Sequence, residues 1–513
     1  MRKSNAGLLP IYSSACYLLA IAAFFLISCS ASKSTVSPYK KYPLVKIQKD
    51  YRIFQDMLEE SHPSLYWYTP KENMDRFFQR GYQQLKDSMT EGEFRKVLSY
   101  VIAEIKCGHT SVRPSKRFQG FFDSVRARSF PFSLKIWSDT AVVLTNLVRQ
   151  DSVLKRGTVI SSINGMPIRT IVDSLSKYLP ADGFNQTHKW QTLSNRGFFG
   201  SLYTSLFGIS EKYRVEYIDS AGQVKSMLIP AYNPAADTAV RSASNTSDRL
   251  LPVLTKKERK QIQIQNTRSF RLDSVNHIAF LNLNTFSSGS QVKKFLRSSF
   301  RSLQKNTVEY LVIDVRGNGG GSVTNSTIFS RYIADRPFIV ADSLYAIKKR
   351  SRYGRYIHNN FINWLFINFF TGKKDDGRFH FGYFERHSYK PKKKKHFDGQ
   401  IYILTGGNSF SATTLFVSSV QKQENVTVVG EETGGGAYGN SAWLIPDVTL
   451  PETRVRFRLP LFRLVIDKDI PKDGRGVMPE IAVPPTVQDI LKGRDNKMEK
   501  IMELIRENKK GRG

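Results

Sequence analysis

The sequence predicts an α/β protein with a helical N-terminal region, a small β-rich module and a larger domain built on a mixed, partly parallel sheet. Residues 46–105 carry apolar side chains at a spacing of three to four, which is typical of amphipathic helices. Residues 128–232 contain short alternating runs separated by turn residues, which predict strands. From residue 275, strand and helix patterns alternate, and such alternation favours a substantially parallel sheet.

The first residues predict an address outside the cytoplasm. The basic MRKSN precedes the apolar LLPIYSSACYLLAIAAFFLIS, and Leu26-Ile27-Ser28-Cys29 follows. This segment resembles a bacterial lipoprotein signal, with residues 1–28 removed, Cys29 carrying lipid and residues 29–45 as a tether. An N-terminal transmembrane anchor is the alternative. We expect a membrane-anchored protein of the cell envelope, facing the periplasm or the surface.

The charge of the chain is strongly basic, at +33. A large positive charge is typical of proteins that bind nucleic acid, an anionic membrane face or acidic partners. The predicted address argues against nucleic acid and leaves the membrane as a partner.

The helical region spans residues 46–127 in this interpretation. Thr90 with Glu93 predicts a capping box at the start of its last long helix. His62, in a helical stretch before a proline, is interpreted as structural. Cys16 lies in the signal and Cys29 is the lipid acceptor, so Cys107 has no disulfide partner. No zinc-ligand spacing is present, and we expect neither a metal nor a cofactor.

The β-rich module spans residues 128–235. Within it, LKRGTVISSINGMPIRTIVDSL (154–175) resembles the central part of a PDZ domain, and an unrelated small β module is the alternative. Asn164-Gly165 is a strong hairpin signal on local grounds alone. Residues 236–270 are polar and predict a linker.

The third region spans residues 271–495, followed by a basic tail at 496–513. A basic insertion at 341–398 interrupts its strand–helix pattern, and from Lys348 to Asp398 it has 14 lysines and arginines against four acidic residues. The insertion contains FINWLFINFF (361–370), which is too short to cross a bilayer. We favour a lid that packs on the domain, with contact to an anionic membrane surface as the alternative.

The stretch LTGGNSFSATT places Ser411 between a buried strand and a helix. At this turn Ser411 is either a helix cap or a nucleophile, and Ser409 is the near alternative. A helix N-terminus favours negative charge, and the Ala412 amide would point into the same space. The glycines at 317–321 follow another buried strand, where backbone amides can approach a ligand. Either motif alone is compatible with ordinary turn chemistry.

The order of the motifs is more specific. DVRGNGGG, TGGNSFSATT and VVGEETGGG after a PDZ-like module resemble the C-terminal-processing and tricorn-type serine peptidase family. HPSLYW, CGHTSV and GRGVMPEIAVPPTVQDILKGRD resemble its tricorn-like branch. The resemblance implies a ClpP/crotonase-like α/β catalytic domain, Ser411 as nucleophile, and oxyanion donors at the amides of Gly320 and Ala412.

The resemblance also suggests the base and its acid. Gly436 stands where the processing branch has a lysine, so the tricorn-like Gly-His-Thr motif selects His109 as base. Asp473 fits best as the acid that orients His109, with Asp469 and Asp467 as rivals. Cys107 replaces the family's more usual aspartate and has no evident catalytic role.

The implied function is a lipid-anchored serine endopeptidase that acts on peptides or unfolded protein termini, with the PDZ-like module holding a C-terminus or gating access. Two alternatives stay open at this point. One is a non-catalytic protein that binds peptides or apolar ligands on the same scaffold, and the other is a membrane-surface adaptor.

Overall fold

The computed structural model describes residues 37–125, 127–237 and 254–511. The expected signal and Cys29 lie outside the described residues. Everything reported below belongs to one compact unit, Pro38–Gly513. No helix in the described ranges is both long enough and apolar enough to pass through a bilayer.

The N-terminal region is mainly helical, as predicted. Thr90 and Glu93 form the expected capping box, in which each side chain accepts a hydrogen bond from the other residue's amide. The elements are β1 (Lys41–Tyr42), α2 (Leu44–Ser61), α3 (Lys71–Gln83), β2 (Met89–Thr90), α4 (Glu91–Glu104), β3 (Val112–Arg113) and α5 (Lys116–Ser124).

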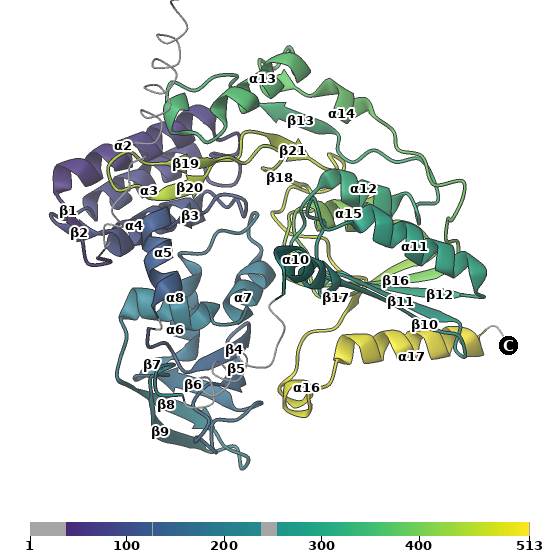
Figure 1. The fold of residues 1–513 in the computed structure, drawn as a ribbon, viewed down its shortest axis with the longest axis horizontal. Helices are drawn as coiled ribbons and strands as arrows, with labels where there is room; N and C mark the ends of the chain where they lie inside the picture. Colours follow the sequence, from purple (N-terminus) through teal and green to yellow (C-terminus); the bar gives the residue numbers. More distant parts are fainter. Residues whose placement is uncertain (1–36, 126, 238–253, 512–513) are drawn as a thin grey trace, which may run out of the picture. The chain divides into compact units, whose positions relative to one another are not determined.

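The apolar core of this region is completed by a hairpin from the C-terminal third of the chain. Strands β19 (Asp447–Thr449) and β20 (Arg456–Arg458) pair antiparallel, and β20 pairs with β3 (Figure 1). The Phe457 ring lies edge-on to Phe54 of α2, with 5.2 Å between their centroids. The helical region is therefore not a separate domain, because its core includes residues far along the sequence.

The β-rich module contains a sheet with the order β4-β5-β6-β8-β9, in which all neighbours are antiparallel. Asn164 and Gly165 have φ of 50° and 78° and join β6 to β7, so the predicted hairpin is confirmed. The likeness to a PDZ domain stays a prediction. The elements are β4 (Phe132–Trp137), β5 (Thr140–Asn146), β6 (Val159–Ile163), β7 (Met166–Pro167), α6 (Ile168–Ser176), α7 (Gln186–Ser194), α8 (Phe198–Phe207), β8 (Lys212–Ile218) and β9 (Val224–Pro230).

The third region is built on a six-stranded sheet with the order β10-β11-β12-β16-β17-β22 (Figure 1). Only β10 runs antiparallel to its neighbour, so the predicted α/β class with a mixed, partly parallel sheet is confirmed. The elements are α10 (Lys256–Gln265), β10 (Arg268–Asp273), β11 (Ile278–Leu283), α11 (Val292–Lys305), β12 (Tyr310–Asp314), α12 (Val323–Ser330), β16 (Gln400–Thr405), α15 (Ala412–Val420), β17 (Val426–Gly430) and β22 (Ile481–Ala482).

Helices cover this sheet on both faces. Helices α11, α12 and α15 contribute to one apolar core against it, and α17 (Asn496–Lys510) contributes to another. Residues 496–513, expected as a basic tail, therefore contain a packed helix in which Ile501 and Ile505 are buried. The expected linker contains a helix, α10, and the start of strand β10. A further short helix, α16 (Val487–Lys492), precedes α17.

The basic insertion packs on the third region through a second sheet. Its strands have the order β14-β15-β13-β21-β18, and its apolar core reaches Leu415 of α15. Helix α13 buries Ile367, but Phe361, Ile362, Phe369 and Phe370 are each more than half exposed. The elements are β13 (Ser343–Ala346), η1 (Gly354–Tyr356), α13 (Asn360–Phe370), β14 (Gly372–Lys373), β15 (Phe379–His380), α14 (Gly382–Arg386), β18 (Gly439–Asn440) and β21 (Arg463–Val465).

The shared core leads to a stability prediction. Phe457 is fully buried against α2. We expect Phe457→Ala to lower the free energy of unfolding by about 3–5 kcal/mol, because the truncation leaves a cavity in a packed core. Urea unfolding monitored by circular dichroism measures this change.

Val275 provides the control, since its side chain is 87% exposed. We expect Val275→Ala to change the free energy of unfolding by no more than about 0.5 kcal/mol. Equal effects of the two substitutions would show that the hairpin contributes nothing to the helical core.

Candidate active site

Ser411 lies at the turn between β16 and α15 in an uncommon backbone conformation. Its φ is 57° and its ψ is −120°, a backbone conformation that residues other than glycine rarely adopt. Such a residue costs about 1–3 kcal/mol and persists only where its surroundings hold it. Its side chain makes no capping hydrogen bond to α15 and is partly exposed. The cap interpretation is therefore not supported, and the hydroxyl is available for other chemistry.

Ser409, the alternative nucleophile, uses its hydroxyl in hydrogen bonds that hold the turn. Its hydroxyl donates a hydrogen bond to the Val315 carbonyl at 2.8 Å and accepts one from the Gly406 amide at 3.2 Å. The side chain is fully buried. These contacts distinguish the two serines and leave Ser411 as the candidate.

The glycine-rich turn after β12 lies against Ser411, as parallel neighbouring strands require. A Cβ at Gly320, where φ is 91°, would lie 2.8 Å from Ser411 Cβ and 2.9 Å from the Ala412 amide nitrogen. The two expected oxyanion donors are thus close together, but only one of the two amides is free of a hydrogen-bond partner in the described part of the chain. The Gly320 amide donates to Asn318 Oδ1 at 2.9 Å, whereas Ala412 begins α15 and its amide has no partner among the described residues. In this conformation only Ala412 offers a donor.

His109 lies in the loop between α4 and β3, beside the Ser411 turn. The ring of Phe410, the residue before Ser411, stacks on the imidazole with 4.6 Å between centroids. His109 is 5% exposed, and neither ring nitrogen has a hydrogen-bond partner. The structure therefore brings the predicted nucleophile and base segments together, but the two side chains are not hydrogen-bonded to each other.

The carboxylate beside His109 is Asp182, from the loop between α6 and α7. It accepts hydrogen bonds from the amides of Gly108 at 2.8 Å and Gly436 at 3.2 Å. Its Oδ1 lies 3.9 Å from His109 Nδ1, which is too long for a hydrogen bond but close enough for attraction. Burial lowers the pKa of His109 and Asp182 partly opposes this, so the imidazole is held neutral near pH 7.

The three aspartates expected to orient His109 lie elsewhere. Asp473 is exposed and accepts a hydrogen bond from the Arg475 amide. Asp467 pairs with Lys422 at 2.9 Å, and Asp469 is exposed. The loop that holds these three aspartates follows β21, and the carboxylate that lies 3.9 Å from His109 Nδ1 is instead Asp182, from the loop between α6 and α7. The sequence offered little signal for Asp182, because Ala-Asp-Gly reads as an ordinary turn.

His188 is a second neighbour that the sequence did not suggest. Phe410 stacks on it as well, with 4.8 Å between centroids and an interplanar angle of 15°. Its Nδ1–H donates to the Gly407 carbonyl at 2.8 Å, which fixes the ring. Burial lowers the pKa of His188. Phe410 thus packs against two imidazoles.

Gly436 stands where the processing branch has a lysine, and the structure leaves little room for a side chain there. A Cβ at this position would lie 3.5 Å from Asp182 Cβ and 2.7 Å from the Gly439 carbonyl oxygen. A side chain at residue 436 would therefore compete for the space beside Asp182, next to the imidazole. The Gly436 amide instead binds the Asp182 carboxylate directly.

His62 is structural, as predicted. Its Nδ1 accepts from the Ser64 amide at 3.2 Å, so its Nε2–H donates to Thr110 Oγ1 at 2.8 Å. Complete burial lowers the pKa of His62 to about 3. Through Thr110, this neutral histidine supports the loop that carries His109.

Arg463 is a buried cation near the site. Its guanidinium lies 3.3 Å from the centroid of the Trp67 ring and donates to Ser64 Oγ at 3.1 Å. Its charge interacts with Asp182 and Cys107. Arg463 therefore ties β21 to the helical region while compensating the buried Asp182 carboxylate.

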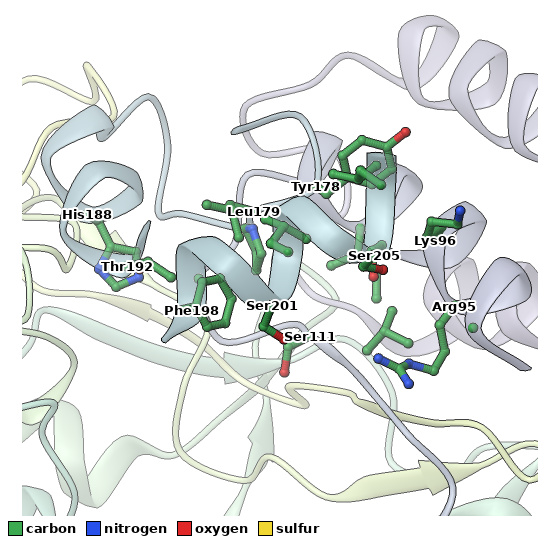
Figure 2. Close-up of a pocket in the computed structure, with 18 residues that line it drawn as sticks. Arg95, Lys96, Ser111, Tyr178, Leu179, His188, Thr192, Phe198, Ser201 and Ser205 are labelled. Carbon is green, nitrogen blue, oxygen red and sulfur yellow. The ribbon is translucent and has the colours of Figure 1, made fainter. Parts of the chain in front are cut away.

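A cavity of about 360 Å³ reaches the site from the β-rich module. Figure 2 shows most of its labelled side chains coming from α4, α7 and α8, with His188 at one end and Arg95 and Lys96 at the other; Ser111, Tyr178 and Leu179 come from loops. Gly108 also lines it, so the cavity borders the His109 loop. It offers space for groups of a ligand near the imidazole.

Comparison with known proteins gives one family match. Residues 277–483 match the model of peptidase family S41. A comparison with curated proteins finds no match. The matched range contains Gly320, Ser411 and Ala412 but neither His109 nor Asp182.

Solved structures show similar folds. Mature CPAF in complex with lactacystin has 15% sequence identity and a TM-score of 0.60, covering 90% of this chain and 98% of its own. Mature CPAF alone has 16% identity and the same TM-score and coverage. The photosystem II D1 C-terminal processing protease has 13% identity and a TM-score of 0.40, covering 87% of this chain and 96% of its own. At these identities the likeness to CPAF concerns the fold alone.

The environment of His109 leads to a titration prediction. We expect its pKa, followed by NMR of ¹³C-labelled histidine, to lie below the usual 6.5, because burial disfavours the charged ring. Asp182→Asn lowers the pKa further, since that carboxylate is the group that raises it. The stability that this neutral ring contributes is present above pH 6.5 and is lost as the pH falls through the folded-state pKa.

Asp473→Asn is the matched control, and we expect it to leave the His109 titration unchanged. A shift with Asp473→Asn and none with Asp182→Asn would mean that the acid was assigned to the wrong residue.

Proposed function

We propose that this serine-type peptidase, whose residues 277–483 match peptidase family S41, is an endopeptidase acting on peptides or unfolded protein termini. The observation that carries this proposal is the Ser411 turn. An unbonded, partly exposed hydroxyl lies at a helix N-terminus, and the preceding residue packs on a buried neutral imidazole. This arrangement supports Ser411 as nucleophile and His109 as base.

The proposed reaction follows the chemistry of acyl transfer. Ser411 Oγ attacks the scissile carbonyl while His109 accepts its proton. The Ala412 amide and the N-terminus of α15 stabilise the negative charge on the carbonyl oxygen. His109 then donates the proton to the leaving amine. A water molecule, deprotonated by His109, attacks the acyl carbonyl, and His109 returns that proton to Ser411 Oγ as the acid is released.

Asp182 acts on the Nδ1 side of the ring, which leaves Nε2 for Ser411. Its carboxylate stabilises the imidazolium that forms during attack. Because Phe410 stacks on the imidazole here, the productive state requires a movement of Phe410 or of the His109 loop when substrate binds. Catalytic hydrogen bonds commonly tighten only in the substrate complex. The Gly320 amide joins the oxyanion site only if it leaves Asn318.

The nucleophile can be tested directly. We expect Ser411→Ala to abolish labelling by a fluorophosphonate probe and to lower peptide hydrolysis by at least about 10³-fold, because the covalent step is lost. Ser409→Ala is the control and should still be labelled. Labelling of Ser411→Ala at the wild-type level would contradict the proposal and would favour a ligand-binding protein with another reactive residue.

The location of the enzyme is a second part of the proposal. The segment Leu26-Ile27-Ser28-Cys29 supports a lipid anchor at Cys29, in the cell envelope. Helix α13 supports a further contact with the membrane, because its exposed Phe361, Ile362, Phe369 and Phe370 sit within a strongly basic segment. Aromatic side chains with lysines and arginines around them favour the interface of an anionic bilayer.

Vesicle binding tests the α13 contact in a chain that begins after Cys29. We expect Phe361→Ser with Phe370→Ser to weaken binding to anionic vesicles about tenfold or more, since two aromatic side chains no longer enter the interface. Phe122→Ser with Val125→Ser is the control, because these residues are also exposed but lie at α5 and just beyond it. Equal binding by both double variants would leave packing on the domain as the role of the insertion.

A further inference from the structure

Three side chains of types that ligate metals in other proteins lie close together, and one of them is the proposed base, His109. One ligand atom from each of Cys107, His109 and Asp182 lies within 4.8 Å of the other two, and all three residues are buried. Both nitrogens of His109 lack a hydrogen-bond partner, which is costly for a buried polar group. The peptidase reaction uses His109 and Asp182 but gives Cys107 nothing to do.

We propose that Cys107, His109 and Asp182 form a zinc site that holds the enzyme inactive. The inference rests on the proposed role of His109 as base. Thiolate sulfur, imidazole nitrogen and carboxylate oxygen are the ligands that zinc prefers, and three protein ligands leave a fourth position for water. Sequence spacing alone did not indicate the site, because Asp182 comes from a distant loop.

The geometry needs only a small contraction. Three atoms no more than 4.8 Å apart admit a central point within about 2.8 Å of each, whereas zinc bonds are about 2.0–2.3 Å long. Movements of about 0.5–0.8 Å, within reach of side-chain rotation, would close the shell. His109 Nδ1 is the nitrogen on the Asp182 side, at 3.9 Å from Oδ1.

The charges also balance. Burial raises the pKa of Cys107, so the thiol is protonated without metal. Binding of Zn²⁺ forms a Zn–S bond and releases one proton to solvent. The thiolate and the Asp182 carboxylate together neutralise the dication, so the nearby Arg463 faces a neutral cluster rather than an added positive charge.

Zinc in this site blocks catalysis through His109. Bound at Nδ1, the metal withdraws electron density from the ring and takes the carboxylate that stabilises the imidazolium. Zinc takes the lone pair of Nδ1, so the neutral ring carries its single proton on Nε2, and Nε2 then has no lone pair with which to accept the proton of Ser411. Removal of the metal by a chelator restores the base.

Cobalt provides a readout that does not depend on activity. Cys107 is the single cysteine after Cys29, so a thiolate-to-cobalt absorption band in a chain that begins after Cys29 reports this site alone. We expect Co²⁺ to give the band in the wild type, and Cys107→Ser to abolish it. Absence of the band in the wild type overturns the proposal, whatever the enzyme's activity.

Inhibition provides the second arm. We expect buffered Zn²⁺, but not Mg²⁺, to inhibit peptide hydrolysis reversibly, and Cys107→Ser to be as active as the metal-free wild type with at least tenfold weaker inhibition. Equal inhibition of Cys107→Ser overturns the proposal. If neither protein hydrolyses peptides while the cobalt band is present, the proposed endopeptidase activity fails and the metal site stands.

Discussion

The antiparallel pairing of β3 with β20 fixes where the His109 loop lies. Val112 and Arg113 pair with Phe457 and Arg456, and the Arg458 amide donates to the Ser111 carbonyl at 2.9 Å. His109 is only a few residues before this attachment. A movement of the helical region relative to the hairpin would therefore displace the imidazole as well. The contact of Arg463 with Trp67 and Ser64 is a second tie across the same boundary.

Several energetically costly features meet at the site. Ser411 has a strained backbone, His109 has two unpartnered buried nitrogens, and Asp182 is a buried carboxylate held by amides. Local departures of this kind are expected where function opposes stability. The packing of Phe410 against His109 and His188 helps to shield the two imidazoles from water.

Much of the architecture follows from local sequence signals. The capping box at Thr90, the Asn164-Gly165 hairpin and the alternating strands and helices of the third region all have short-range causes. Ser411 and His109 were indicated by motifs whose residues are adjacent in sequence. Asp182 and the contacts of Phe410 were not, because they depend on loops that meet only in three dimensions. Helix α17 had an apolar spacing of three to four at Met498, Ile501 and Ile505, but its many charges concealed it.

The contribution of the β19–β20 hairpin to the N-terminal core has a consequence for biosynthesis. A ribosome releases the His109 segment long before it makes residues 447–458, and domains form as their parts become available. Until that hairpin emerges, the early helices lack part of their apolar interior and the imidazole has no fixed neighbour. A half-made polypeptide therefore lacks the assembled candidate site, so the peptidase cannot cleave other chains, or itself, before its synthesis is complete.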